Sequence, residues 1–310
     1  MELIRGRHNL RPAHRGCAVT IGNFDGLHLG HQAVLAQLAG RAGSLDLPAV
    51  VMSFEPTPRE YFAGSSAPPR LLRFREKFEG LAAAGVDRLF LVRFGRRVAD
   101  LSPQAFIQEF LVDGLDVQYL VIGDDFRFGR NRAGDFDTLV QAGQEHGFEV
   151  TDTPTRMVDD IRVSSTAVRK ALGEGDLELA ERLLGRPYSM TGRVIPGDRL
   201  GRRLGYPTAN LRPGRQVLPL NGVFAARVIG AAERSLPAVV NLGTRPTVEG
   251  TEPLLEAHLF DFEGDLYGKR LTVEFVRRLR DEERFENVER LRMQMDEDAA
   301  RARAVLAGQA

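Results

Sequence analysis

The chain has 310 residues, which is longer than most single domains, so we expect two domains. Its 42 Lys and Arg residues balance 42 Asp and Glu residues, and this neutrality gives no general reason to expect a nucleic-acid or membrane partner. The single cysteine, Cys17, excludes an intramolecular disulfide framework, and no Cys/His cluster has zinc-ligand spacing. Because we find no signal-like leader and no run of about 18 apolar residues, we expect a cytoplasmic protein.

The first part of the chain alternates short strand-like runs with helical patterns. The strand-like runs lie at 17–22, 48–54, 88–94, 117–123 and 148–153. The helical patterns lie at 31–42, 74–85, 102–114 and 136–147, and the last three end in or next to Gly, as many helices do. This order predicts a parallel sheet with helices on both faces and ligand sites beyond the carboxyl ends of the strands.

The pattern changes after a helical segment at 177–185. Later strand-like runs, at 222–230, 236–243, 254–262 and 270–280, are separated by Gly, Pro and Asn and predict a small antiparallel barrel. A last amphipathic helix, at about 286–307, would pack Val288, Leu291 and Met295 inward. We therefore predict an α/β chain with a parallel-sheet, Rossmann-like domain at 1–185 and a β-barrel domain with a terminal helix at 186–310.

The first group of chemically informative residues follows the first predicted strand and reads G-N-F-D-G-L-H-L-G-H, residues 22–31. Gly22 and Gly26 permit a sharp turn and a close approach to a ligand. His28 and His31 stand at the start of a helix, whose N–H groups and dipole favour an anion. Two imidazoles there can donate hydrogen bonds to the α-phosphate and bridging oxygen of ATP in the transition state. The alternative is a glycine-rich turn with incidental histidines.

This stretch resembles the G-x-F-D-G-x-H-x-G-H signature of bacterial FAD synthetases, within the H-x-G-H nucleotidylyltransferase superfamily. The resemblance implies that the phosphate of FMN attacks the α-phosphorus of Mg-ATP and that pyrophosphate leaves, with no covalent enzyme intermediate. It assigns catalysis to His28 and His31. It assigns nucleotide binding to Gly22, Phe24, Asp25 and Gly26. For Asp25, a structural role in the turn remains open.

Two further segments match the same family. One is G-D-D-F-R-F-G at 123–129, with Gly134 behind it, and the other is R-V-S-S-T-A-V-R at 162–169. Hydroxyl groups at a helix N-cap and planar Arg cations suit the β- and γ-phosphates of ATP, although helix capping alone would also explain the hydroxyls. The residues assigned to these phosphates are Arg162, Ser164, Ser165, Thr166 and Arg169.

Flavin contact is expected at the same edge of the sheet. The segment Ser53–Pro56 follows the second predicted strand, and we assign Ser53, Phe54 and Phe128 to flavin binding. Asp125 is assigned to nucleotide or flavin contact, and a turn-stabilising Asp is its alternative.

The second group of chemically informative residues is G-R-R-L-G-Y-P-T-A-N at 201–210, which resembles the riboflavin kinase motif G-x-x-L-G-x-P-T-A-N. Gly201 and Gly205 allow the backbone to approach the phosphates of a nucleotide, and Pro207 stiffens the segment that follows. Thr208 and Asn210 offer neutral oxygen ligands to Mg²⁺ that arrives with ATP.

Kinase chemistry also needs a group that accepts the proton of the riboflavin hydroxyl as it attacks the γ-phosphorus. Strand alternation in L-E-A-H-L places Glu256 and His258 on one face, and the resemblance assigns the catalytic role to Glu256. An exposed strand carboxylate is the alternative. Asn241, Arg280 and Phe285 are assigned to flavin, although Arg280 and Phe285 also suit a surface charge and a core residue.

Three other functions compete with this interpretation. Another H-x-G-H nucleotidylyltransferase would share the first motif, but it would not explain the riboflavin kinase motif. A flavin-binding carrier would bind flavin without consuming ATP. A nucleic-acid-binding module is suggested only by the cluster Arg199, Arg202 and Arg203. We predict a bifunctional enzyme acting on ATP, riboflavin and FMN to make FAD, without nucleic acid or membrane partners, as a monomer or weak homo-oligomer.

Overall fold

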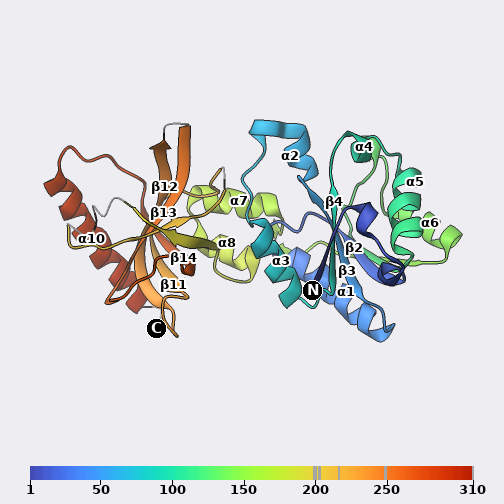
Figure 1. Cartoon of the computed structure of the whole chain (residues 1–310), viewed down its shortest axis with the longest axis horizontal. Coiled ribbons are helices and arrows are strands. Elements are labelled where there is room, and N and C mark those ends of the chain that lie inside the picture. The colour runs from blue at the N-terminus through green and yellow to red at the C-terminus, as the bar shows by residue number, and fades with distance from the viewer. Residues whose placement is uncertain (198–200, 202–203, 216, 248–249, 309–310) are drawn as a thin grey trace. The chain divides into compact units, whose positions relative to one another are not determined.

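The computed structural model describes residues 1–197, 201, 204–215, 217–247 and 250–308, and the chain forms two compact units (Figure 1). Unit 1 contains Met1–Pro68 and Phe74–Val163, and unit 2 contains Pro69–Arg73 and Ser164–Ala310. The expected domain boundary between residues 185 and 186 stays a prediction. The arginines behind the nucleic-acid hypothesis, Arg199, Arg202 and Arg203, lie outside the described residues.

Unit 1 is built on a six-stranded sheet in which all neighbouring strands are parallel, as predicted. The strands, in the order β1-β4-β3-β2-β5-β6, are β1 (Glu2–Arg5), β4 (Arg88–Arg93), β3 (Ala49–Glu55), β2 (Cys17–Ile21), β5 (Val117–Gly123) and β6 (Glu149–Thr153). From β2 the chain proceeds first to one edge through β3 and then to the other through β5. Such a change of direction opens a crevice beyond the carboxyl ends of the two central strands.

Helices cover both faces of this sheet (Figure 1). The helical segments of unit 1 are α1 (Leu29–Ser44), α2 (Pro58–Ala63), α3 (Phe74–Ala83), α4 (Arg96–Ala99), α5 (Pro103–Phe106), the π-helical segment η4 (Ile107–Leu115) and α6 (Phe136–His146). Short 3-10 turns are η1 (Arg7–Asn9), η2 (Pro12–His14), η3 (Gly64–Ser66) and η5 (Arg130–Arg132), and β7 (Met157–Val158) pairs with β8 (Ile161–Arg162).

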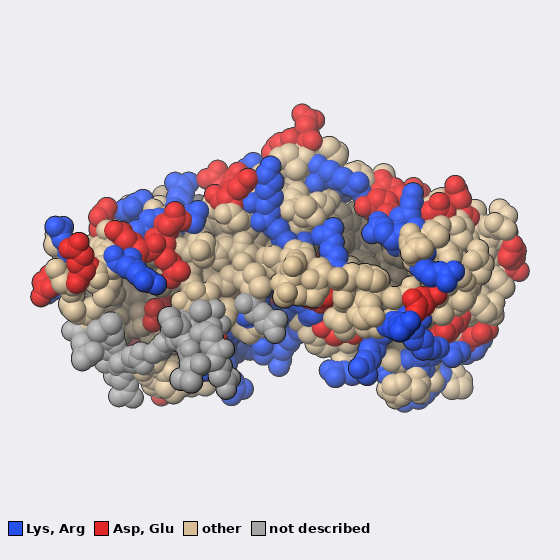
Figure 2. All heavy atoms as spheres, turned by 90° about the horizontal axis from the view of Figure 1, so that it is seen from above, with Lys and Arg blue, Asp and Glu red and all other residues tan. Residues whose placement is uncertain are grey.

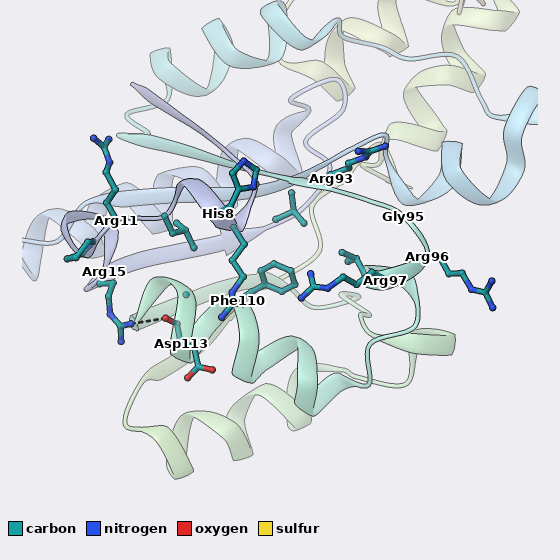
Figure 3. Close-up of a pocket in the computed structure, with 16 residues that line it drawn as sticks. His8, Arg11, Arg15, Arg93, Gly95, Arg96, Arg97, Phe110 and Asp113 are labelled. Atoms are coloured by element: carbon teal, nitrogen blue, oxygen red, sulfur yellow. Dashed lines mark hydrogen bonds between the residues drawn. The ribbon is translucent and has the colours of Figure 1, made fainter.

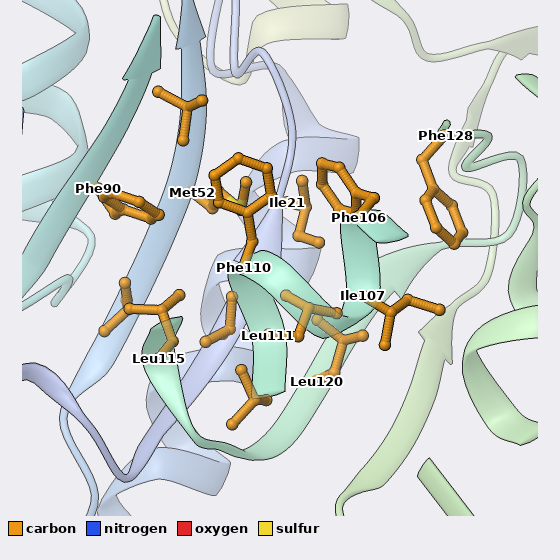
Figure 4. Packing of buried hydrophobic residues seen from close by; sticks show 14 of the residues in the cluster. Ile21, Met52, Phe90, Phe106, Ile107, Phe110, Leu111, Leu115, Leu120 and Phe128 are labelled. Atoms are coloured by element: carbon orange, nitrogen blue, oxygen red, sulfur yellow. The ribbon is translucent and has the colours of Figure 1, made fainter. Parts of the chain in front are cut away.

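One hydrophobic core of unit 1 lies between the sheet and the α5, η4 and α6 segments (Figure 4). Cys17, Val19 and Ile21 of β2 point into it, because alternate residues of a strand share a face. Phe106 and Phe110 meet them from α5 and η4. Since α1 packs on β2, β3 and β5 from the other side, the central strands are buried on both faces, as a parallel sheet requires.

Within its described residues, unit 2 contains two helices, a closed six-stranded barrel and a long last helix. The helices are α7 (Ser165–Glu174), α8 (Leu177–Leu184) and α10 (Val288–Ala307). The barrel runs β10 (Ala209–Arg212), β13 (Gly250–Leu259), β12 (Leu236–Thr247), β11 (Gly222–Ile229), β14 (Arg270–Arg280) and β9 (Ser189–Ile195). Each pairing is antiparallel, so the predicted barrel and terminal helix are confirmed.

The terminal helix packs through the predicted face, because residues 288, 291, 295, 299, 302 and 306 follow one another at helical spacing, but the contact lies nearer its C-terminal end than we predicted. Val288 is 51% exposed, and the prediction that it packs inward is wrong. Contact with the barrel is instead made by the last turns, where Ala299, Ala302 and Leu306 pack against a cluster that includes Phe260. Small side chains in these turns let the helix lie close to the strands. Within the described residues, no helix is long and apolar enough to cross a membrane.

Candidate active sites

The loop after β2 has an unusual backbone. Phe24, Gly26 and Leu27 all have positive φ angles, of 49°, 90° and 47°, and two of the three are not glycine. L-residues rarely adopt this conformation, and such strain is commonly kept at functional sites. At Gly22, an added Cβ would lie 3.0 Å from the ring of Phe24, so a side chain there would disturb the loop. The predicted glycines therefore serve the shape of the turn.

The two histidines of this loop form a stacked pair at the start of α1. Their ring centroids are 3.6 Å apart with an interplanar angle of 18°. His28 is the N-cap of α1, and its Nδ1 accepts a hydrogen bond of 3.3 Å from the backbone N–H of His31. Because Nδ1 is the acceptor, the neutral ring of His28 carries its proton on Nε2. The N-cap contact thus fixes which nitrogen of His28 can donate to a ligand.

His31 is held in its neutral form. Burial lowers the pKa of its imidazole well below the ordinary value, and the nearby His28 and Lys77 lower it further. Its Nδ1 is buried and has no hydrogen-bond partner among the described residues. Thr20 Oγ1, Asn23 Oδ1 and Ser53 Oγ, also near the carboxyl ends of β2 and β3, share this property. Buried polar atoms usually have partners, so these four atoms suggest a ligand or bound water at this edge.

The loop after β5 brings two predicted residues together. Arg162 forms an ion pair of 2.6 Å with Asp125, and its distance to Asp124 is 3.9 Å. Asp124 fixes the loop by accepting hydrogen bonds of 2.9 Å from the backbone N–H and the hydroxyl group of Thr155. Burial would raise the pKa of Asp124, but these hydrogen bonds and the charge of Arg162 outweigh it, and the pKa is lowered.

The remaining phosphate-binding candidates belong to unit 2. Ser164 is the N-cap of α7, and its side chain accepts a hydrogen bond of 3.1 Å from the N–H of Ala167. Arg169 lies on the second turn of the helix and donates from Nε to the carbonyl oxygen of Pro69 at 2.7 Å. Ser165 and Thr166 occupy the first turn between them. A contact of these residues with ATP stays a prediction.

In the barrel, strand register places three predicted residues side by side. Glu256 of β13 lies opposite Asn210 of β10 on one side and opposite Asn241 of β12 on the other. Directly opposed residues of antiparallel strands have their side chains on the same face, with Cβ atoms about 5 Å apart. Leu255 and Ala257 are buried in the barrel, as the predicted alternation requires. Two amide groups and one carboxylate therefore share its outer face.

The loop before β10 is folded around Gly201. The carbonyl oxygen of Gly201 accepts hydrogen bonds from the N–H groups of Leu204 and Tyr206, at 3.0 and 2.8 Å. Gly205 has a φ of 89°, which favours glycine. An added Cβ at Gly201 would lie 3.4 Å from the hydroxyl oxygen of Thr208. The hydroxyl that we assigned to the metal thus lies beside the glycine that we assigned to the phosphates.

His258 and Tyr206 secure this loop from outside. His258 Nδ1 donates a hydrogen bond of 2.9 Å to the carbonyl oxygen of Pro207, the residue before Thr208. The hydroxyl group of Tyr206 donates to the carboxylate of Asp296 on α10, and burial together with Asp296 raises the pKa of Tyr206 to about 12. The Tyr206 and His258 rings meet edge to face, with centroids 5.0 Å apart.

Comparison with known proteins matches both parts of the chain. The family model described as FAD synthetase matches residues 10–167, and the one described as riboflavin kinase matches residues 184–306. The bifunctional riboflavin kinase/FMN adenylyltransferase of Escherichia coli K12 is 50% identical over 304 residues, covering 98% of this chain and 97% of that protein. The chain belongs to this bifunctional family.

Other relatives extend this picture. The Pseudomonas fluorescens bifunctional riboflavin kinase/FMN adenylyltransferase is 51% identical over 308 residues, which is 99% of this chain and 98% of that protein. A crystal structure described as a macrolide-efflux protein from Streptococcus pneumoniae has a TM-score of 0.83 and 28% identity, covering 98% of this chain and 99% of that one. This enzyme is thus a riboflavin kinase and an FMN adenylyltransferase, which together convert riboflavin to FAD.

The structure also reveals an aromatic group in the adenylyltransferase module that sequence reasoning found only in part. The predicted Phe54 meets Phe94 and Phe106 at centroid distances of 5.8 and 6.5 Å, and Phe106 lies 5.3 Å from the predicted Phe128. Phe94 in turn contacts Phe62, which is 71% exposed. The sequence could have indicated Phe62 and Phe94 as members of this group, because they follow strands β3 and β4 at the edge where the site was expected.

Two predicted flavin residues of the kinase module lie together. The guanidinium of Arg280 stands over the Phe285 ring, 5.5 Å from its centroid. It also forms hydrogen bonds of 2.8 to 3.1 Å with the carboxylate of Asp298, which is only 3% exposed. The ring of Phe285 and the carboxylate of Asp298 together fix the orientation of the planar guanidinium, which suits a residue that lines a binding site. Contact with flavin stays a prediction.

Proposed function

We propose that His28 and His31 carry out the adenylyl transfer. The Nε2–H of His28 would donate to the α-phosphate of ATP while an oxygen of the FMN phosphate attacks the α-phosphorus. The bond to the bridging oxygen breaks, and pyrophosphate leaves with the electron pair. The stacked pair at the N-terminus of α1 is the observation that carries this proposal, because the N-cap contact at Nδ1 makes Nε2 the protonated nitrogen of the neutral His28 ring.

The other nucleotide contacts follow from the same placement. Backbone groups of the loop at Gly22, Phe24, Asp25 and Gly26 would surround the adenylyl group, and Asp125 with Arg162 would close the crevice after β5. Ser164, Ser165, Thr166 and Arg169 would bind the β- and γ-phosphates. We propose that these residues act within an adenylyltransferase domain at 1–185 and that the kinase domain comprises 186–310.

We propose that flavin lies against the aromatic group of unit 1. Ser53 is fully buried, and its hydroxyl oxygen has no hydrogen-bond partner among the described residues. Phe62 offers an exposed ring of suitable size for an isoalloxazine, and the buried Phe54 and Phe128 belong to the aromatic group behind it. A side chain such as Phe62, exposed to 71% yet backed by Phe94, has little structural reason to be aromatic.

Replacing Phe62 by Ala is expected to raise the KM for FMN about tenfold, because stacking on one aromatic side chain contributes roughly 1–3 kcal/mol. Phe62→Trp should stay near the wild-type value, since it keeps a ring face. Steady-state kinetics of FAD formation at varied FMN would measure both. A KM unchanged in Phe62→Ala would remove Phe62 from the flavin site.

We propose that Glu256 is the general base of the kinase. The 5′-hydroxyl oxygen of riboflavin attacks the γ-phosphorus of ATP, the bond to the ADP oxygen breaks, and Glu256 accepts the hydroxyl proton. Asn241, on the same face across the strand pair, would bind riboflavin together with Arg280 and Phe285. Gly201 and Gly205 would admit the phosphates of ATP.

The metal of this reaction is proposed to be Mg²⁺ that enters as Mg-ATP. The Thr208 hydroxyl and the amide oxygen of Asn210 are neutral oxygen ligands, which this ion accepts. Asn210 is only 8% exposed and lies opposite Glu256, which supports a metal site beside the proposed base. When bound, the ion neutralises charge on the transferring phosphoryl group. We further propose a cytoplasmic monomer or weak homo-oligomer without nucleic-acid partners.

His258 is expected to position the Thr208 segment. Asn has an amide nitrogen where His has Nδ1, so His258→Asn can still donate to the carbonyl oxygen of Pro207, whereas His258→Ala cannot. Loss of one such hydrogen bond should lower kcat/KM for riboflavin phosphorylation by about three- to tenfold in His258→Ala, with recovery in His258→Asn. Conversion of FMN to FAD serves as the internal control. Equal losses in both variants would contradict the positioning role.

A further inference from the structure

A large pocket of unit 1 lies away from the histidine pair. It has a volume of about 970 Å³ and is lined by residues of the 6–15 segment, the end of β4, the 95–98 segment and η4 (Figure 3). In the sheet order, β1 and β4 are separated from β2, which carries the histidine loop, by β3. None of the residues assigned above to ATP or flavin lines this pocket. It is therefore a separate feature of the unit.

The lining is strongly basic in a chain whose net charge is zero. Its arginines are Arg7, Arg11, Arg15, Arg93, Arg96 and Arg97, and His8 lies among them. Asp113 is the only carboxylate of the lining, and its oxygen already accepts a hydrogen bond from Gln108. By contrast, acidic and basic side chains are interspersed over the face seen in Figure 2. A local excess of one charge in a concave site attracts ligands of the opposite charge.

Only part of this positive charge is compensated. Arg11 pairs with Glu2 at 2.6 Å, Arg97 with Glu109 at 2.8 Å and Arg96 with Asp100 at 3.5 Å. No ion pair is formed by Arg7, Arg15 or Arg93 within the part of the chain that the structure describes. Of these three, Arg15 donates to the backbone carbonyl of Asp113 at 2.7 Å. Guanidinium groups of this kind suit the oxygens of a phosphate.

The floor of the pocket is apolar. Val92, Val98 and Phe110 are 4%, 8% and 1% exposed, and Leu10 is partly buried beside them. Figure 3 shows Arg97 extending toward the ring of Phe110, whereas Arg96 points away from it. An apolar floor below a rim of arginines matches a ligand that has a flat ring at one end and a phosphate at the other.

We infer that this pocket binds a phosphate-bearing heteroaromatic compound, the class that includes both adenine nucleotides and FMN, at a site separate from catalysis. The phosphate would lie at the arginine rim and the ring on the apolar floor. The inference does not depend on the roles of His28 or Glu256, since neither residue lines the pocket.

Two substitutions in the full-length enzyme test this without touching the catalytic groups. Arg7→Glu reverses one charge of the lining and breaks no ion pair between residues that the structure describes. Gly95→Phe places a large side chain in the pocket, because Gly95 belongs to its lining. The backbone should tolerate the change, since Gly95 has an extended φ of −167° and a Cβ there would meet no atom within 4 Å. Arg234→Glu, on an exposed position of unit 2, is the matched control for charge.

Equilibrium dialysis with ADP, FMN and pyrophosphate as separate probes would count the bound molecules per chain. We expect Arg7→Glu and Gly95→Phe to weaken one binding event for ADP or for FMN by about tenfold or more. In these two variants the other binding events and the rate of riboflavin phosphorylation should match the wild type. Arg234→Glu should bind all three probes as the wild type does. Weaker binding of ADP alone would identify the ligand as an adenine nucleotide, and weaker binding of FMN alone would identify it as FMN. Unchanged stoichiometry and affinity in both variants would overturn the inference, as would a site that binds pyrophosphate but neither nucleotide.

Discussion

A His28→Ala variant is expected to convert riboflavin to FMN and then stop. It lacks the Nε2–H donor that we place on the α-phosphate of ATP, and removal of one such donor typically lowers a rate about 100- to 1000-fold. Chromatographic separation of riboflavin, FMN and FAD over time measures this directly. The kinase step should proceed at its normal rate, since Glu256 and the Thr208 segment belong to the barrel.

Because His28 also caps α1, capping must be separated from catalysis. Asn at this position has an oxygen that can accept the backbone N–H of His31, as Nδ1 does, but it has nothing in place of Nε2. His28→Asn should therefore unfold at the wild-type temperature and still lose FAD formation. Substitution of His146, at the end of α6, is the histidine control. Normal FAD formation by His28→Asn would show that the ring acts only as a cap.

Strand-like runs and motif spacing predict most of the fold, because both depend on local sequence. The β-branched runs specify five strands of the parallel sheet, and the histidine motif falls where β2 passes into α1. The sequence did not predict β1, whose four residues, E-L-I-R, gain their strand conformation from pairing with β4. The helix expected at 102–114 continues past Phe106 as a π-helical segment, a change of hydrogen-bond spacing that side-chain periodicity does not reveal.

Site geometry was harder to predict, because it depends on contacts distant in sequence. Alternation placed Glu256 and His258 on one face, but only the register of the closed barrel aligns Glu256 with Asn210 and Asn241. Likewise, the lowered pKa of His31 depends on burial and on Lys77, which comes from a helix 46 positions later in the chain. The motif gave the residue types, and tertiary structure sets their protonation and alignment.

Glu256→Gln is expected to lose riboflavin phosphorylation and to keep FAD formation from FMN, which is the reverse of the defect expected in the His28 variants. The amide keeps the shape of the side chain but cannot accept the proton of the riboflavin hydroxyl, and loss of a general base typically costs about 100-fold or more. Added FMN should still become FAD at the normal rate. Glu252→Gln is the matched control, because Glu252 lies on the same face of β13 and forms only a partly exposed ion pair with Arg212.

The two defective enzymes should also complement each other. In a mixture of His28→Ala and Glu256→Gln with riboflavin and ATP, the first variant releases FMN and the second adenylylates it, so FAD should appear after a lag that shortens as enzyme concentration rises. This outcome requires that each site acts on its own and that FMN passes through solution.

One result would contradict the role of Glu256 as the base. If Glu256→Gln phosphorylates riboflavin at a rate within about threefold of the Glu252→Gln control, the Glu256 side chain is not the base, and the proton must pass to another group or to water.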